Sequence, residues 1–398
     1  QPSALVSGST LYYRGNAVGG GSAVIRDTIG DTGGAGAKQA TFGNLGGTST
    51  GFTFTGSTDA TSTYDSNAIT WTDPTTSAPT LLVTGQDNAG NDATGTTLTF
   101  ANDTTGPTVA ANTVSPTTRN TSAGVTLTAT DAGSGTCAIY YTTDGTTPAF
   151  DAAGAATGTT TRVLGGSAPF TLSADGTHTI KHIAVDNLGN AGTVVTGQTI
   201  VIDTVIPVSA FTAPAASAVI SGASVTVSGT GTDAASGVAS IQIGVQPFGA
   251  GSFSNVGTSS AISPISKTLD TTGLADGAAT LRIVTTDNAG NTHTATRAVT
   301  IDNVAPVVSA VAAPTGLTNS ATTTVTLTAT DAATALTTPT YEVRSATLTV
   351  DTCGAYGAYG PLAMDGGGTA ASSVATNFAL TNQMCYQFRY TVSDSAGH

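Results

Sequence analysis

One aspartate-rich turn motif recurs four times in this chain of 398 residues. It reads Asp-Asn-Ala-Gly-Asn at 87–91 and 287–291, Asp-Asn-Leu-Gly-Asn at 186–190, and Asp-Ser-Ala-Gly-His at 394–398. Asp and Asn supply oxygen ligands for hard cations, and they also cap backbone donors in tight turns. The third position is Ala or Leu and no Glu ends the motif, so it does not match the calcium loop of helix–loop–helix proteins. We expect it to be first of all a hairpin turn between two strands.

Two further aspartates recur in a fixed order with this motif. One lies four residues before a Pro, at Asp103, Asp203 and Asp302, and the other closes a strand-like run, at Asp131, Asp233 and Asp331. The steps between the two are 28, 30 and 29 residues, and the turn motif follows 55, 54 and 63 residues later. A constant spacing of this kind indicates internal repeats, here of roughly 100 residues. We predict four domains, at 1–104, 105–204, 205–303 and 304–398.

The composition and the hydrophobic pattern favour an all-β fold. Only 9% of the residues are charged, 39% are hydrophobic, and 23 of the 24 acidic residues are Asp rather than the helix-favouring Glu. Apolar and small polar residues alternate in segments such as 125–130 and 280–287, as they do in half-buried strands. About 100 residues with roughly seven short strands is the size of an immunoglobulin-like sandwich. We expect a tandem array of four such β-sandwich domains forming an extended rod, with the first strand of repeat one unclear and the last strand of repeat four missing.

The repeated markers resemble those of a known group of domains. Thr-x-Thr-Asp-Ala-x-Ser-Gly, Asp-Asn-x-Gly-Asn and Asp-x-x-x-Pro, in this order, are similar to the bacterial Ig-like repeats of large secreted and cell-surface proteins of the adhesin type. The resemblance covers repeats two to four. Within repeat two, residues 139–148 and 179–190 also resemble the chitobiase C-terminal-like sandwich domain that is appended to some chitin-degrading enzymes. The resemblance implies a structural role, and calcium at the joints between domains.

The three kinds of aspartate should converge at each joint between repeats. On an Ig-like sandwich the chain entry, the loop after the second strand and the last hairpin share one pole. Three carboxylates repel one another unless a cation lies among them, and calcium takes roughly six to eight such oxygens. We therefore expect calcium as a stiffening cofactor, whereas in the alternative each Asp caps its own turn and stays solvated. The predicted ligands are Asp103, Asp131 and Asp186; Asp203, Asp233 and Asp287; and Asp302, Asp331 and Asp394.

Other residues offer fewer opportunities for chemistry. Cys353 and Cys385 lie in one repeat, and a disulfide between them would indicate an oxidising compartment. His178 and His182 would stand about 13 Å apart on a strand, so a structural role suits them better than chelation. Tyr356 and Tyr359, in a Gly-rich loop, are candidate platforms for a sugar ring. No catalytic motif is recognisable, and the dispersed aspartates do not form the paired carboxylates of a glycosidase, so we expect no enzyme.

Charge and hydropathy limit the partners. A formal charge of −13 argues against nucleic acid, which needs a basic face, and no apolar run reaches the length of a membrane span. The predicted function is an extracellular or cell-surface stalk, spacer or fibre segment whose partners are neighbouring Ig-like repeats or subunits of the same fibre. Two alternatives remain open: a filament subunit that assembles by strand donation between chains, and a carbohydrate-binding accessory region of a secreted enzyme that contacts glycans.

Overall fold

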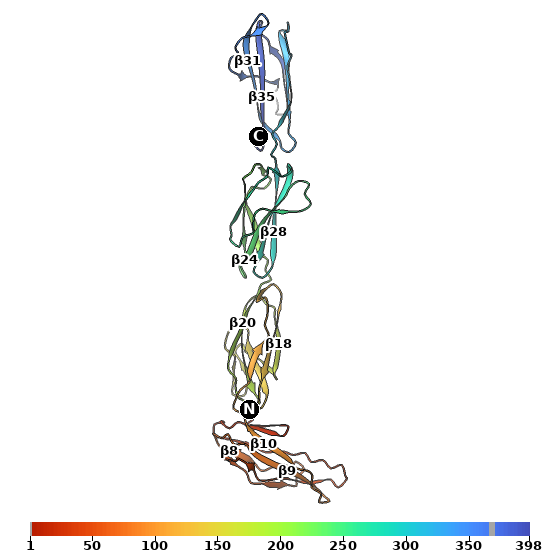
Figure 1. The fold of residues 1–398 in the computed structure, drawn as a ribbon, viewed down its shortest axis with the longest axis vertical. Helices are drawn as coiled ribbons and strands as arrows, with labels where there is room; N and C mark the ends of the chain where they lie inside the picture. The colour runs from red at the N-terminus through yellow and green to blue at the C-terminus, as the bar shows by residue number, and fades with distance from the viewer. Residues whose placement is uncertain (1, 366–370) are drawn as a thin grey trace. The chain divides into compact units, whose positions relative to one another are not determined.

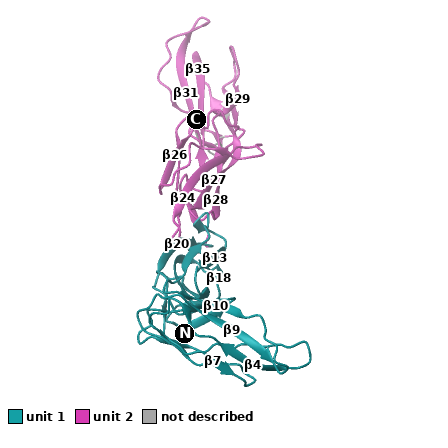
Figure 2. Cartoon of the chain, turned by 60° about the horizontal axis from the view of Figure 1, so that its bottom comes forward, with its two compact units in different colours: residues 1–204 teal, residues 205–398 magenta. Residues whose placement is uncertain are grey.

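The fold is all-β, as the sequence predicts. A computed structural model describes residues 2–365 and 371–398, and within these ranges it contains strands, turns and no α-helix. The chain divides into two compact units, residues 1–204 and 205–398 (Figure 2). Each unit contains two of the predicted repeats, and each repeat is a pair of facing sheets. In the described part of the chain no helix has the length and hydropathy needed to cross a membrane.

The first repeat packs a large sheet against a small one. The large sheet has the order β1-β2-β10-β9-β4-β7, with β5 also paired to β9, and the small sheet has the order β3-β8-β6. β2 runs parallel to β10, while β1 forms a hairpin with β2. The strands of the large sheet are β1 (Ala4–Ser7), β2 (Thr10–Tyr13), β4 (Ala37–Phe42), β5 (Gly46–Gly47), β7 (Ser57–Asp59), β9 (Pro79–Asp87) and β10 (Thr96–Asn102). The strands of the small sheet are β3 (Gly21–Ala23), β6 (Phe52–Thr53) and β8 (Ile69–Trp71).

The second repeat has a sheet β11-β13-β18 and a sheet β12-β20-β19-β14-β17. A ribbon of β15 and β16 belongs to neither sheet. The strands are β11 (Thr108–Ala111), β12 (Thr118–Arg119), β13 (Ala123–Thr130), β14 (Thr136–Thr142), β15 (Ala149–Phe150), β16 (Ala156–Thr157), β17 (Thr161–Leu164), β18 (Ser167–Leu172), β19 (Gly176–Asp186) and β20 (Val195–Ile202).

The third repeat has the same arrangement without the ribbon. Its sheets are β21-β23-β26 and β22-β28-β27-β24-β25, and β24 and β28 mark the second of these in Figure 1. The strands are β21 (Val208–Ala213), β22 (Val219–Ile220), β23 (Val225–Thr232), β24 (Val238–Gln246), β25 (Ser254–Asn255), β26 (Ile265–Leu269), β27 (Gly277–Asp287) and β28 (Thr292–Ile301).

In the fourth repeat the sheet β29-β30-β34 faces a sheet built on β31, which pairs with β32, β33 and β35. The long strands β31 and β35 run side by side in antiparallel register (Figure 1). The strands are β29 (Val307–Ala312), β30 (Thr322–Thr330), β31 (Leu336–Thr349), β32 (Thr352–Cys353), β33 (Gly360–Pro361), β34 (Ser372–Ala379) and β35 (Met384–Asp394).

Strand alternation explains where the motif aspartates lie. Every second residue of β27 faces the core, namely Ala279, Leu281, Ile283 and Thr285. Asp287, the last residue of the strand, lies on the same face and is also buried. Because successive side chains on a strand point to opposite faces, an Asp an even number of residues after the core positions must also turn inward. β19 and β35 end in the same way, with Asp186 and Asp394 buried.

Candidate metal centre

Each residue of the turn motif has a specific partner. In the second repeat, Asp186 Oδ1 accepts hydrogen bonds from the backbone N–H groups of Leu188 (2.9 Å) and Asn190 (2.8 Å). Gly189 has φ of 90°, a left-handed conformation that glycine adopts without strain. Asn187 Nδ2 donates across to the carbonyls of Ser134 and Gly135, which lie in the loop that follows Asp131. The motif is therefore a capped hairpin turn that also holds the neighbouring loop.

The same turn occurs in the first repeat without an acid group around it. Asp87 accepts from the backbone N–H of Asn91 and from its side-chain amide, both at 2.7 Å, and Asn88 Nδ2 donates to the carbonyls of Ala35 and Gly36. Capping thus needs no metal, and the motif by itself does not define a site. In the second repeat, two further carboxylates, those of Asp103 and Asp131, lie beside the motif Asp.

Asp103, Asp131 and Asp186 converge in the first compact unit. Each offers one carboxylate oxygen, and these oxygens all lie within 4.8 Å of one another. Asp103 directly follows β10, Asp131 directly follows β13 and Asp186 ends β19, so the group joins the end of the first repeat to two loops of the second. Asp103 and Asp186 are buried, at 6% and 0% exposure. Burial raises the pKa of Asp186, the charge of Asp103 raises it further, and the hydrogen bonds from Asn190 oppose both effects.

The buried residue Ser134 contacts this group through its backbone. The backbone N–H of Ser134 donates to Asp103 Oδ2 at 2.7 Å, and its side chain is 5% exposed. Ser134 Oγ is buried and has no hydrogen-bond partner within the described residues. A buried hydroxyl without a partner is costly, and three converging carboxylates repel one another. A hard cation among the three carboxylates would relieve their repulsion.

The approach of Asp103 also explains a glycine in the loop. A Cβ on Gly133 would lie 2.4 Å from the carboxyl carbon of Asp103. Asp131 Oδ1 meanwhile caps the N–H groups of Gly133 (2.9 Å) and Gly135 (2.8 Å), so only one of its oxygens is occupied by the turn. The Thr-Asp-Ala-x-Ser-Gly loop is therefore shaped to bring its own carboxylate close to that of Asp103.

The fourth repeat gathers a different set from the predicted one. Asp302 and Asp394 converge with His398, and one ligand atom of each lies within 4.8 Å of the others. Asp331 is not a member of this group. Its Oδ1 caps the N–H groups of Ala333 (2.9 Å) and Thr334 (2.7 Å), as Asp131 Oδ1 caps its own loop. The hydroxyl of Thr334 donates to Asp302 Oδ2.

The remaining triad, Asp203, Asp233 and Asp287, draws on both compact units and stays a sequence prediction. Within the second unit its two members repeat the capping pattern. Asp233 Oδ1 accepts from the N–H groups of Ala235, Ser236 and Gly237, and Asp287 accepts from the backbone and the side-chain amide of Asn291.

Cys353 and Cys385 are joined in a disulfide between β32 and β35, with a sequence separation of 32. Tyr356 and Tyr359 lie in the following loop, but guanidinium groups already stack on them. Arg344 lies 5.0 Å from the ring centroid of Tyr356 and 4.5 Å from that of Tyr359. Arg389 lies 4.1 Å from the same Tyr359 centroid. These contacts fix the loop on the sheet, and a sugar stacking on the same ring faces would have to displace an arginine.

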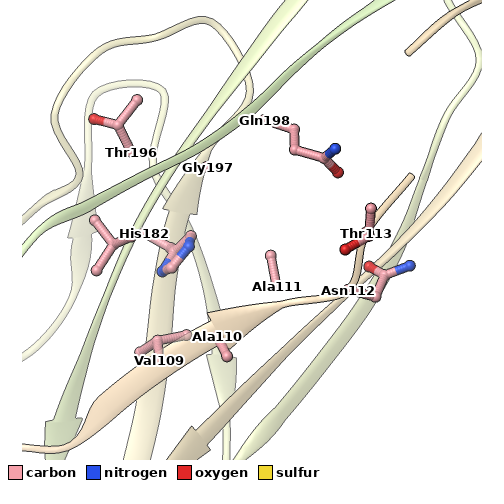
Figure 3. A pocket seen from close by; sticks show the side chains of 10 residues that line it. Val109, Ala110, Ala111, Asn112, Thr113, His182, Thr196, Gly197 and Gln198 are labelled. Atoms are coloured by element: carbon pink, nitrogen blue, oxygen red, sulfur yellow. The ribbon is translucent and has the colours of Figure 1, made fainter. Parts of the chain in front are cut away.

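A hollow of about 380 Å³ opens between β11 and β20 in the second repeat (Figure 3). His182 forms part of its lining, together with Ala111, Gly197 and Gln198 (Figure 3). The imidazole is 1% exposed, its Nδ1 has no partner within the described residues, and burial lowers its pKa. A larger hollow of about 840 Å³ lies beside the disulfide of the fourth repeat and includes Asp351 as its only acidic lining residue within the described ranges. Neither hollow is lined by a pair of described carboxylates.

Comparisons with known proteins agree with the sandwich fold. Residues 207–283 match the family model of a bacterial Ig domain, and residues 125–199 match that of an Fn3-associated domain. These two matches fall on the second and third predicted repeats, and they agree with the Ig-like resemblance that the sequence markers indicate. No curated protein matches it.

Several solved structures resemble the chain at low identity. A tetra-tandem repeat from the extending region of a large adhesion protein is 18% identical, with a TM-score of 0.29, over 94% of this chain and 100% of that one. A 1.5-MDa bacterial ice-binding adhesin is 17% identical, with a TM-score of 0.30, over 72% of this chain and 92% of that one. The fibronectin(III)-like modules of Clostridium thermocellum CbhA are 13% identical, with a TM-score of 0.28, over 49% of this chain and 94% of that one.

Proposed function

We propose that this chain is a structural segment of a bacterial extracellular or cell-surface protein of the adhesin type, whose repeats are stiffened by calcium at their joints. The observation that carries the proposal is the convergence of Asp103, Asp131 and Asp186 from the end of one repeat and two loops of the next. A cation bound there would tie three separate backbone segments together. The bacterial Ig match and the scarcity of charged residues, 9% of the chain, support a role as a repeat segment.

The donor set suits calcium. Carboxylates are hard oxygen ligands, and calcium accepts roughly six to eight oxygens in flexible geometry, with water and carbonyl groups completing the shell. Magnesium demands a tighter octahedron, which a group assembled from three loops is less able to provide. Burial is the main cause of the raised pKa of Asp186, and the bound ion would offset the further contribution from the charge of Asp103.

The mechanical consequence follows from the linker. Asp103 and Pro107 are four residues apart, and the proline restricts one backbone dihedral of this short connection. With the carboxylate of Asp103 held against the loops of Asp131 and Asp186, the linker loses most of its remaining freedom. Without the ion the same charges disfavour close approach and the joint loosens. Calcium therefore sets the stiffness of the segment.

Calcium titration of the metal-free chain tests the site, using isothermal calorimetry of the wild type and Asp186→Asn. The matched control is Asp87→Asn, which alters the same capped turn in the first repeat, where no acid group forms. We expect Asp186→Asn to lose one bound calcium and Asp87→Asn to keep the wild-type stoichiometry. Equal stoichiometry in both variants would reject calcium at this joint.

Small-angle scattering with calcium and with excess chelator tests the mechanical role. We expect the profile of an extended, stiff particle in calcium and that of a flexible chain after chelation. If the scattering profile is the same with and without chelator, the aspartates act only as caps of their own turns. A mass that rises with protein concentration would instead favour the filament alternative, in which chains exchange strands.

A further inference from the structure

The turn motif of the fourth repeat carries a histidine where the other three carry asparagine. His398 lies four residues after Asp394, as Asn190 lies four residues after Asp186. Asn190 presents its Nδ2 to Asp186 Oδ2 at 2.7 Å, and His398 presents its Nδ1 to Asp394 Oδ2 at 3.0 Å. An amide nitrogen cannot ligate a metal, whereas a neutral imidazole nitrogen is among the commonest metal ligands.

The acids around His398 have no other cation to balance them. Asp302 is 0% and Asp394 3% exposed, and the only ion pair that either makes within the described residues is the one between Asp394 and His398. Buried carboxylates are expensive unless they are paired or coordinate a metal.

We infer that Asp302, Asp394 and His398 form a site for zinc or a similar borderline divalent ion rather than for calcium. The inference rests on the proposed function, because it takes the joint acids to be cation ligands. Its new element is a nitrogen donor in place of a carboxylate, because the group of the fourth repeat contains His398 and does not contain Asp331. Calcium gains little from an imidazole, whereas zinc, cobalt and nickel bind mixed nitrogen and oxygen sets with three protein ligands and water.

Cobalt(II) provides the readout, because zinc is spectroscopically silent. The full chain, freed of metal with chelator, is titrated with cobalt chloride while its visible d–d absorption is recorded. We expect one cobalt whose bands vanish on adding equimolar zinc chloride and persist in excess calcium chloride. In His398→Asn, which restores the asparagine of the other motifs, we expect the cobalt affinity to fall by at least about tenfold. The control is His178→Asn, a partly buried histidine on β19 outside the acid group, which should leave the titration unchanged.

The outcomes separate this inference from the proposed function. If calcium binding fails everywhere but the cobalt site survives and depends on His398, the inference stands and the calcium proposal falls. If calcium binds and Asp186→Asn removes one ion, but cobalt gives no bands, the inference is overturned alone. Cobalt binding that is unchanged in His398→Asn, or that calcium displaces at equal concentration, would also overturn it.

Discussion

The side-chain amide of Asn190 lies 3.0 Å from the backbone carbonyl oxygen of Asp103, a residue 87 positions earlier in the chain. The same Nδ2 donates to Asp186 Oδ2 at 2.7 Å, so one amide group connects the linker to the turn motif. The last Asn of the motif is therefore a tie between repeats and not only a part of its own turn. This contact holds the backbone of Asp103 beside the turn motif.

Replacement of Asn190 by Ala should destabilise the joint. The side chain is 3% exposed, and its removal leaves the carbonyl of Asp103 and one oxygen of Asp186 without a donor. An unsatisfied buried polar group costs about 1–3 kcal/mol. Differential scanning calorimetry of the metal-free chain measures the effect. The matched variant Asn91→Ala removes the same amide from an exposed turn, where it bonds Asp87 alone, and should cost far less. Equal losses in the two variants would show that Asn190 does not tie the repeats.

Replacement of Gly133 by Ala should disrupt the acid group itself. The new methyl would meet the carboxyl of Asp103 at 2.4 Å, so either the loop or the carboxylate must move. Overpacking of this kind costs about 1–3 kcal/mol, and calcium affinity should fall with it. Gly124→Ala is the control, because a Cβ there meets nothing within 4 Å. Calorimetric titration with calcium and thermal melts report both effects, and wild-type affinity in Gly133→Ala would contradict the geometry of the site.

The sequence predicts the parts of this fold that follow from short-range periodicity. Alternation along residues 280–287 is enough to place Asp287 on the core side of its strand, and the recurrence of three markers is enough to align the repeats. The composition of the acid group in the fourth repeat was not predictable in the same way. His398 enters it because the fifth position of the motif points toward the acids, which only the hydrogen bonds of Asn190 reveal.

Two further features depend on loops whose paths have no local sequence code. The ribbon of β15 and β16 folds over the outer face of its sheet, so that Tyr140 is buried there and donates to the carbonyl of Gly154 at 2.7 Å. The stacking of Arg344 and Arg389 on Tyr359 likewise joins segments far apart in the chain. The second arrangement covers the ring of Tyr359, which the sequence alone leaves as a candidate for exposure.

Loss of the disulfide should weaken the fourth repeat selectively. Cys353 and Cys385 close a loop of 32 residues, and a crosslink of that length stabilises a domain by about 3–4 kcal/mol through the entropy of the unfolded chain. Thermal melts of Cys353→Ser/Cys385→Ser should show one transition moved to lower temperature and the others unchanged. Cys137→Ser, at the free cysteine of the second repeat, is the control and should leave the transition of the fourth repeat in place. Identical melts of the double variant and the wild type would mean that this bond carries no stability.

The second repeat should lose stability in mild acid because of His182. Burial lowers the pKa of this imidazole, so the folded chain resists a proton that the unfolded chain takes up near pH 6.5. Stability should therefore be constant above that pH, fall as the pH drops below it, and level off once the folded imidazole is also protonated.

His182→Ile should abolish this pH dependence, because isoleucine does not titrate. Isoleucine also suits the position, since the equivalent residue of the third repeat, four residues before the motif Asp, is the fully buried Ile283. Melts of the metal-free chain between about pH 8 and pH 5 compare this variant with the wild type and with His178→Gln, at a less buried histidine on the same strand. A pH dependence that persists in His182→Ile, or that disappears in His178→Gln, would assign the acid sensitivity to another group.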